Sequence, residues 1–290
     1  MSTNVLPPIS ARRRTSDRIA RGVTLALTLL ALVPLFLVLY YLFKQGLGAF
    51  SWSFFTTDPT GRFIGDPGGI RSAIVGTLII VGMATAVAVP LGIGVALYLV
   101  EYGKKSRFAN TVRYFVDVMT GVPSVMFGLF IYIVLVISQI GGTFTAWKGA
   151  VALGLLMLPV VARASEVVLN LVPDALRESA LALGAPRWRV VFRIVLPTAL
   201  PGLVTGSMLA VARAAGETAP LLFTAAFVYG LSTDVGQRMN SLPLQIYNDV
   251  GQAQDRLVQR AWGAALTLVL MILLVTLVAR LVQRRSRLQP

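Results

Sequence analysis

The chain has no cysteine and no histidine among its 290 residues, and only 13% of its residues are charged. Without cysteine it can form neither disulfides nor thiolate metal sites. Without histidine it lacks the commonest general base and metal ligand. A typical soluble domain carries about 25% charged residues, so much of the polar surface that water requires is missing here.

Long apolar runs take the place of that polar surface: 56% of the residues are hydrophobic and the mean hydropathy is +0.76. Five uncharged runs cover residues 23–43, 72–100, 118–147, 194–212 and 261–279, and a sixth candidate runs from 149 to 172. These runs match the roughly 17–25 residues that a helix needs to cross the hydrocarbon core. The sequence therefore predicts an all-α polytopic membrane protein with six transmembrane helices.

The 26 Lys and Arg residues outnumber the 12 Asp and Glu residues, giving a net charge of +14. If the N-terminus lies inside, most of these cations fall on one face, as the positive-inside rule requires of the cytoplasmic side. That face includes Arg113 and Arg177, and the opposite face collects Lys44, Arg62, Arg71, Lys148, Arg238, Arg256 and Arg260. Both termini are thus expected in the cytoplasm of a cell that carries the chain in its inner membrane. No nucleic-acid partner is needed to explain the charge.

Polar segments between the apolar runs divide the chain. The expected division is a cytoplasmic arm at 1–18, a six-helix transmembrane domain at 19–283 and a cytoplasmic tail at 284–290. Within the domain, 173–193 is a cytoplasmic loop and 231–260 an external loop. Gly121-Val122-Pro123-Ser124 breaks the third span. Such a break is tolerated inside a membrane only where it faces protein or a water-filled cavity.

The cytoplasmic loop carries a helix-start signal at Pro173-Asp174 and a stop at Gly184. The pattern E-A-A-x3-G-x9-I-x-L-P, which marks ABC importer permeases, is matched at Glu178, Ala180, Gly184, Ile194, Leu196 and Pro197, with Ser179 as the only departure. The chain therefore resembles that family. The resemblance implies a type I ABC importer permease fold with a cytoplasmic coupling helix. It also implies that the coupling helix meets a separate ATPase subunit through Asp174, Glu178, Ser179, Ala180 and Gly184.

Two pairs of opposite charges lie inside the apolar runs: Arg163 with Glu166 at i and i+3, and Arg213 with Glu217 at i and i+4. Either pair can simply neutralise itself on one helix face. Because intramembrane ionisable groups are functional candidates by default, both pairs are also candidates for a substrate pathway. For Arg163 and Glu166 the two interpretations are evenly balanced.

Arg213 is the stronger candidate. It lies roughly 21 Å along the fifth span from its cytoplasmic end, at about 1.5 Å per residue, which is near the middle of the bilayer. A guanidinium there offers a planar fork of donors suited to a tetrahedral oxyanion. Glu217 would hold Arg213 in place.

The segment from Arg213 to Pro220, R-A-A-G-E-T-A-P, resembles the one that marks permeases of the phosphate-specific transport (Pst) system. Other matching stretches are Gly68-Gly69-Ile70-Arg71, Gly76-Thr77, Gly121–Ser124 and Ser241–Tyr247, and Ala219–Phe223 favours the A-type subunit. The resemblance implies a heterodimer with a homologous C-type permease, a dimeric ATPase, an external phosphate-binding protein, and a role for Arg213 in phosphate passage. Ser124, at the helix break, is expected beside that pathway.

Other functions remain open at this stage. An enzyme is improbable because no Ser/His or metal-ligand set exists. The chain has no G-x-x-x-x-G-K-[ST] loop, so ATP hydrolysis belongs on another polypeptide, and no cofactor is expected. A secondary transporter also carries broken helices and buried charges, but it would not need the coupling loop. An ABC permease for sulfate, molybdate or a phosphonate is the nearest alternative.

Overall fold

A computed structural model of the chain describes residues 11–62, 65–103 and 106–286. Within these ranges the backbone forms helices joined by turns and loops, and the only β-type pairing is an isolated bridge between Pro59 and Gly68. The prediction of an all-α fold is confirmed. Lys104 and Lys105 lie outside the described residues, as do residues 1–10 of the expected arm and residues 287–290 of the expected tail.

Five helices are long and apolar enough to cross a membrane, and a bent helix pair supplies a sixth candidate span. The five are α1 (Ala11–Gly46), α3 (Arg71–Leu97) with its π-helical end η2 (Tyr98–Tyr102), α6 (Ala146–Asn170), α9 (Leu196–Ala215) and α12 (Asp255–Ser286). The bent pair joins α4 (Arg107–Gly121) to α5 (Ser124–Ile131) and its π-helical continuation η3 (Tyr132–Ile137). The prediction of a polytopic membrane protein is confirmed.

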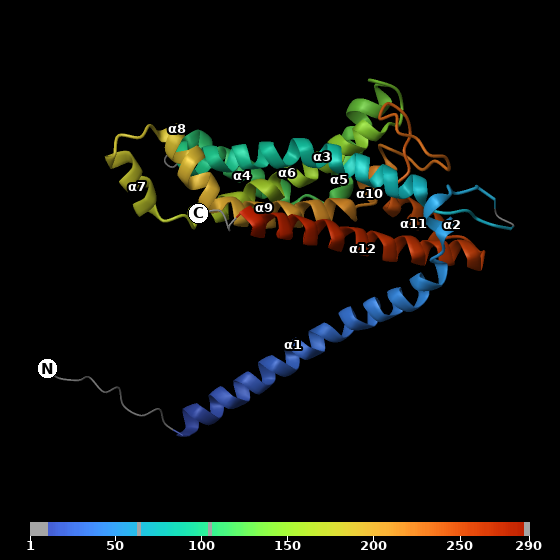
Figure 1. Cartoon of the computed structure of the whole chain (residues 1–290), viewed down its shortest axis with the longest axis horizontal. Coiled ribbons are helices and arrows are strands. Elements are labelled where there is room, and N and C mark those ends of the chain that lie inside the picture. Colours follow the sequence, from blue (N-terminus) through green and yellow to red (C-terminus); the bar gives the residue numbers. More distant parts are fainter. Residues whose placement is uncertain (1–10, 63–64, 104–105, 287–290) are drawn as a thin grey trace.

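Short helices connect the spans. They are η1 (Leu47–Ala49), α2 (Trp52–Thr56), α7 (Asp174–Ala182), α8 (Arg187–Val190) with the π-helical η4 (Val191–Val195), α10 (Ala219–Leu222) and α11 (Leu242–Val250). Figure 1 shows α7 and α8 at one end of the long bundle and α2 and α11 at the other. These short helices therefore lie at the two ends of the spans.

The break in the third span falls where the sequence placed it. Pro123 has no N–H and pushes the residue before it away from helical geometry, and Val122 is extended at φ −73° and ψ 132°. The helices on either side are bent by 102°. The chain thus leaves α4 and enters α5 in a new direction.

The core of the bundle is built by α3, α6 and α9. Small residues let these helices approach closely: a Cβ on Gly92 of α3 would lie 2.8 Å from the Cβ of Val161 on α6. Ile80, Leu153 and Ala214 belong to the main apolar cluster that joins the three helices. This cluster fixes the depth of every residue on α9.

Helix α1 leaves this core along most of its length (Figure 1). No residue of its most apolar window is buried. It is anchored near its C-terminal end, where Tyr41 meets Trp262 edge-to-face at 5.1 Å and Gly46 packs against Leu266. Residues 11–18 of the expected cytoplasmic arm are helical, because α1 already begins at Ala11.

Two further boundaries differ from the expectation. The i, i+4 spacing of Arg213 and Glu217 assumed one continuous helix, but α9 ends at Ala215. Gly216 and Pro220 follow within five residues, and neither favours continuation of a helix. At the other end, α12 begins at Asp255, so the expected external loop at 231–260 is partly helical and also contains α11.

Candidate translocation site and coupling helix

Arg213 lies in the last turn of α9, at the depth of the main core. Its neighbours Ala214 and Ala215 are buried in the cluster that includes Ile80 of α3. Ile80 in turn lies about 14 Å inside α3 from its external end, at about 1.5 Å per residue. The Arg213 side chain is nevertheless 49% exposed. A guanidinium is therefore presented on an uncovered face of the bundle at membrane depth.

Glu217 approaches Arg213, but not on the same helix face as the i, i+4 spacing predicted. Helix α9 has ended at Ala215, and the Glu217 carboxylate reaches back from the following turn to within 3.7 Å of the Arg213 Nε. That distance is an ion pair without a short hydrogen bond. The contact orients the arginine loosely and leaves its terminal nitrogens available to an anion.

Arg163 and Glu166 do meet, with an Arg163 nitrogen donating to Glu166 Oε2 at 3.0 Å. The same carboxylate accepts a 2.6 Å bond at Oε1 from Nε of Arg113, on α4. Glu166 is thus shared by two arginines and is 8% exposed, whereas Arg163 is 50% exposed and has Asp117 at 3.7 Å. Glu166 therefore joins α6 to α4 through Arg113, while Arg163 stays half-exposed.

Ser124 is the first residue of α5, directly after the helix break, and is partly buried. Further along α5, a Cβ on Gly128 would lie 2.6 Å from Cα of Pro220 in α10. Helix α5 therefore packs against the segment that follows Arg213. The structure brings the two sequence motifs, 121–124 and 213–220, into one part of the bundle.

The predicted coupling helix is α7. Ala180 is buried in an apolar cluster that also includes Val100 of η2 and Leu169 of α6, while Glu178 and Ser179 are exposed. Leu183, which follows α7, is 88% exposed. Asp174 begins the helix, as expected.

Gly184 ends α7 through a Schellman arrangement. The φ of Gly184 is +79°. The N–H of Gly184 donates to the carbonyl of Leu181, and the N–H of Ala185 donates to the carbonyl of Ala180. This left-handed conformation favours glycine. The residue's part in the signature is therefore to turn the chain sharply after the coupling helix.

Arg177 is a buried residue of α7 that sequence reasoning counted among the surface charges. Its guanidinium donates to the carbonyl oxygens of Leu169 and Val172 at the end of α6, and to the carboxylates of Glu101 and Asp174. The side chain is 9% exposed. Arg177 lies three residues before the buried Ala180, so the helical period carried the signal that it faces inward.

Arg113 is a second cation that was counted with the surface. Besides Glu166 it binds the Leu99 carbonyl at 2.9 Å and the Asn110 side chain. It lies between Ala109 and Val116, the buried residues of α4. The same helical period again places it on the inward face.

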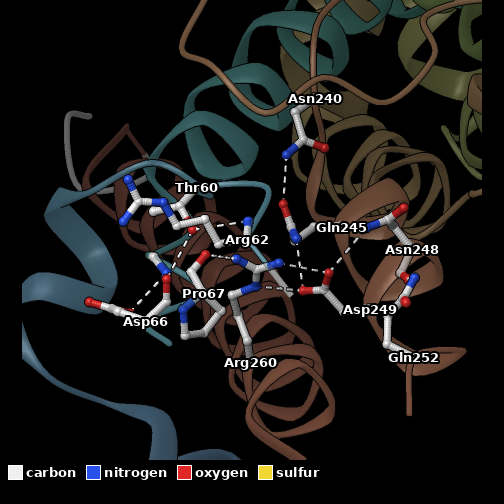
Figure 2. Close-up of polar contacts among 11 residues, drawn as sticks. Thr60, Arg62, Asp66, Pro67, Asn240, Gln245, Asn248, Asp249, Gln252 and Arg260 are labelled. Atoms are coloured by element: carbon white, nitrogen blue, oxygen red, sulfur yellow. Dashed lines mark hydrogen bonds and ion pairs between the residues drawn. The ribbon is translucent and has the colours of Figure 1, made fainter. Parts of the chain in front are cut away.

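The end of the bundle at α11, which is expected to be the external end, holds a closed polar network around Arg260 (Figure 2). Two Arg260 nitrogens donate to the two oxygens of Asp249 at 2.7 and 2.9 Å, and a third donates to the Pro67 carbonyl. Gln245 donates to Asp249 and accepts from Asn240. This network ties α12, α11 and the loop before α3 together, and Arg260 is a buried anchor rather than the surface charge that was expected.

Segments singled out as separate motifs also pair at this end. The Thr77 hydroxyl on α3 accepts from the Leu242 N–H at 2.8 Å. A Cβ on Gly76 would lie 1.9 Å from the Asn240 carbonyl oxygen, so no other residue fits there. The stretches 76–77 and 241–247 therefore hold one another in the folded chain.

Helical spans with a central break, a short cytoplasmic helix between two of them and an arginine at core depth define the permease subunit of a membrane transport system. A family model described as binding-protein-dependent transport system inner membrane component matches residues 88–288. The chain is 40% identical to phosphate transport system permease protein PstA 1 of Mycobacterium tuberculosis, over 98% of this chain and 94% of that protein. It is 38% identical to PstA of Yersinia pestis, covering 96% and 93%. The chain belongs to the PstA family of binding-protein-dependent transport permeases.

A solved structure has the same fold. It is the crystal structure of a bacterial ABC transporter involved in the import of the acidic polysaccharide alginate. The matched chain is 19% identical, with a TM-score of 0.63, and the match covers 94% of this chain and 99% of that one. The expected type I ABC importer permease fold is confirmed.

Proposed function

We propose that the chain is the A-type permease subunit of an ATP-driven phosphate importer and forms half of its translocation pathway. The observation that carries the proposal is the half-exposed Arg213 at core depth, in a chain 40% identical to a phosphate transport permease over nearly its whole length. A guanidinium binds the tetrahedral oxyanion through paired donors. The position and the chemistry of Arg213 both suit this cargo.

The uncovered face of α9 would line the pathway. Thr205, Leu209 and Arg213 follow one another at helical spacing and are all exposed. An arginine facing lipid near the bilayer centre costs about 2.5–3.5 kcal/mol, so this face is better placed against water and a second subunit. Arg163 is a second station for the anion, held by Glu166, and Ser124 lies at the helix break near the same segment. Binding must be weak enough at each station for release.

The second subunit would be a homologous C-type permease. Arg213 needs a facing wall to become part of a closed pathway, and α1 has a fully uncovered apolar length that suits packing against a neighbouring helix. An external phosphate-binding protein would deliver the anion to the end of the bundle that carries α2 and α11. The chain would catalyse no reaction itself.

ATP hydrolysis would take place on a dimeric ATPase that docks at α7. Asp174, Glu178 and Ser179 are exposed on α7 and form the docking surface, together with the turn at Gly184. Ala180 is buried and acts by seating α7 on the spans. In Figure 1 the C-terminal end of α12 lies at the same end of the bundle as α7, which supports cytoplasmic termini.

The proposal is tested by Arg213→Ala in proteoliposomes that hold both permeases and the ATPase, with phosphate-loaded binding protein outside. Uptake of phosphate should fall at least about tenfold, because the substitution removes a contact with the anion, of the order of a kcal/mol, at a position that the anion must pass. Assembly and basal ATP hydrolysis should persist. Arg280→Ala, at an exposed position on α12, removes the same charge away from the pathway and is the matched control.

Undiminished uptake by Arg213→Ala would remove this residue from the pathway. The wild-type complex should also be compared across phosphate, sulfate, molybdate and a phosphonate, each with its own loaded binding protein. Greater stimulation by another oxyanion would overturn the cargo. Uptake that survives removal of the ATPase would identify a secondary transporter.

A further inference from the structure

The cytoplasmic end of α3 is a π-helical turn, η2, that two arginines hold from opposite sides. Arg177 reaches it from α7, and Arg113 reaches it from α4. π-helical turns inside longer helices are strained and are frequently found at functional sites. The arrangement therefore connects the coupling helix to a second span through one short segment.

The contact from α7 runs through Glu101. The Arg177 Nε donates to Glu101 Oε1 at 3.0 Å, and both side chains are about 90% buried at exposures of 9% and 10%. Water therefore competes little for the pair. Because Arg177 also binds the last carbonyls of α6, a displacement of α7 pulls on η2 and α6 together.

The contact from α4 runs through the backbone. An Arg113 nitrogen donates to the Leu99 carbonyl at 2.9 Å, filling one of the acceptors that the end of a helix leaves without an intrahelical partner. The same guanidinium donates to Glu166 at 2.6 Å. The planar fork of donors lets Arg113 bind the Glu166 carboxylate through Nε and the Leu99 carbonyl through a terminal nitrogen, so Arg113 holds η2, α4 and α6 in one relative position.

Apolar packing also joins η2 to α6 and α7. Val100 of η2 lies in one buried cluster with Leu169 at the end of α6 and Ala180 of α7. A close-packed cluster of this kind moves as a body rather than deforming. The two arginine contacts determine which neighbouring helix follows that movement.

We propose that Arg177–Glu101 and Arg113 form a relay across η2, which carries a displacement of α7 to α4. The inference rests on the proposed docking of an ATPase at α7. Helix α4 leads directly into the break at 121–124, and α6 carries Arg163. Movement through the relay therefore reaches the part of the bundle that lines the pathway, and Arg113 and Glu101 are positioning residues for transport.

The test uses one variant on each side of η2 in the reconstituted complex. Glu101→Ala cuts the contact from α7 and leaves Arg177 its carbonyl partners. Arg113→Lys keeps a charge beside Glu166 but cannot also reach Leu99. Each variant should lower the phosphate transported per ATP hydrolysed by roughly five- to tenfold, the size of a typical coupling between sites, with thermal unfolding close to that of the wild type.

The double variant separates a relay from two independent supports. Two cuts in one chain should lower the ratio no further than one cut, whereas independent contacts give effects that multiply. A multiplied loss in the double variant, or an unchanged ratio in either single variant, overturns the relay. Arg71→Lys, which weakens an ion pair with Asp58 at the external end, is the matched control and should leave the ratio unchanged.

A second readout does not depend on the cargo. Because the chain has no cysteine, single cysteines at Phe115 on α4 and Leu274 on α12, both exposed, can carry spin labels whose separation is measured with and without ATP. The wild-type separation should change on ATP binding, and Glu101→Ala should abolish the change. If the wild type imports a different anion, the proposed cargo fails while this response still supports the relay. An equal response in Glu101→Ala overturns the relay alone.

Discussion

The two ends of the bundle, the expected external end at α11 and the expected cytoplasmic end at α7, both hold arginine in ion pairs, but the surroundings of these arginines differ. At the external end Arg260 is 3% exposed against an Asp249 that is fully buried, and the carboxylate is also bound by Gln245. The helices there, α11 and the start of α12, are regular. At the cytoplasmic end Arg113 and Arg177 likewise bind both backbone carbonyls and carboxylates, but they lie next to the π-helical segments η2 and η4.

This difference suggests different roles for the two ends: the network around Arg260 is a fixed platform, whereas the contacts of Arg113 and Arg177 link helices that can move together. A network whose donors and acceptors are all matched resists displacement, because any movement leaves buried polar groups without partners. π-helical turns within longer helices are rare and are frequently found at functional sites. The external end is therefore suited to receive a partner in one geometry, and the cytoplasmic end to pass a movement on.

Arg260→Ala is the strongest test of this difference between the two ends. Removing one partner of a buried ion pair leaves the other charge uncompensated and costs about 3–5 kcal/mol. Thermal unfolding of the purified permease should shift strongly downward, and uptake should be lost together with assembly rather than separately from it. Arg256→Ala on the same helix, at a residue that is exposed and bound to the Gly65 carbonyl, is the control and should shift unfolding little. A normal unfolding temperature for Arg260→Ala would refute the fixed platform.

Lys148 offers a milder disturbance of the external half. Its ammonium is fully buried and donates to the carbonyls of Leu135, Gly142 and Thr143 at 2.6–3.1 Å. Lys148→Met keeps the apolar stem and removes these donors, so unsatisfied carbonyls should cost about 1–3 kcal/mol. Thermal unfolding should fall by several degrees, while phosphate per ATP stays unchanged in the folded fraction.

Lys44→Met provides the comparison for that variant, since Lys44 is exposed at the end of α1. Its unfolding temperature should match the wild type. A lowered transport ratio in Lys148→Met would show that the external half also takes part in coupling, and the contrast between the two ends would then be wrong.

Local patterns in the sequence were enough for the spans, the break at Pro123 and the turn at Gly184. Each depends on a property that neighbouring residues determine: apolar length, a missing N–H, or a left-handed backbone. The end of α9 was missed although Gly216 and Pro220 were visible, because apolar composition continues past them and hid the change of conformation.

The helical period indicates that Arg113 and Arg177 face inward, but it does not identify their partners. Arg113 meets Glu166 across 53 positions, and Arg177 meets Glu101 across 76. Counting charge by loop assigned both arginines to the cytoplasmic face, and Lys148 and Arg260 to the external one. That sum gives an orientation, but it does not reveal which charges the folded chain removes from water.

The smallest expected effect sharpens the comparison at the coupling helix itself. Gly184 has a φ of +79° and, among the described residues, no atom that would lie within 4 Å of an added Cβ. Gly184→Ala therefore adds only backbone strain, about 1–2 kcal/mol, and this strain acts on the last turn of α7. Hydrogen exchange in α7 should become faster and phosphate per ATP should fall about twofold, with global unfolding unchanged. Gly251→Ala, at the end of α11 with a φ of −84° and equal free space, should change neither quantity. Equal effects of the two substitutions would mean that the turn conformation of Gly184 has no part in coupling.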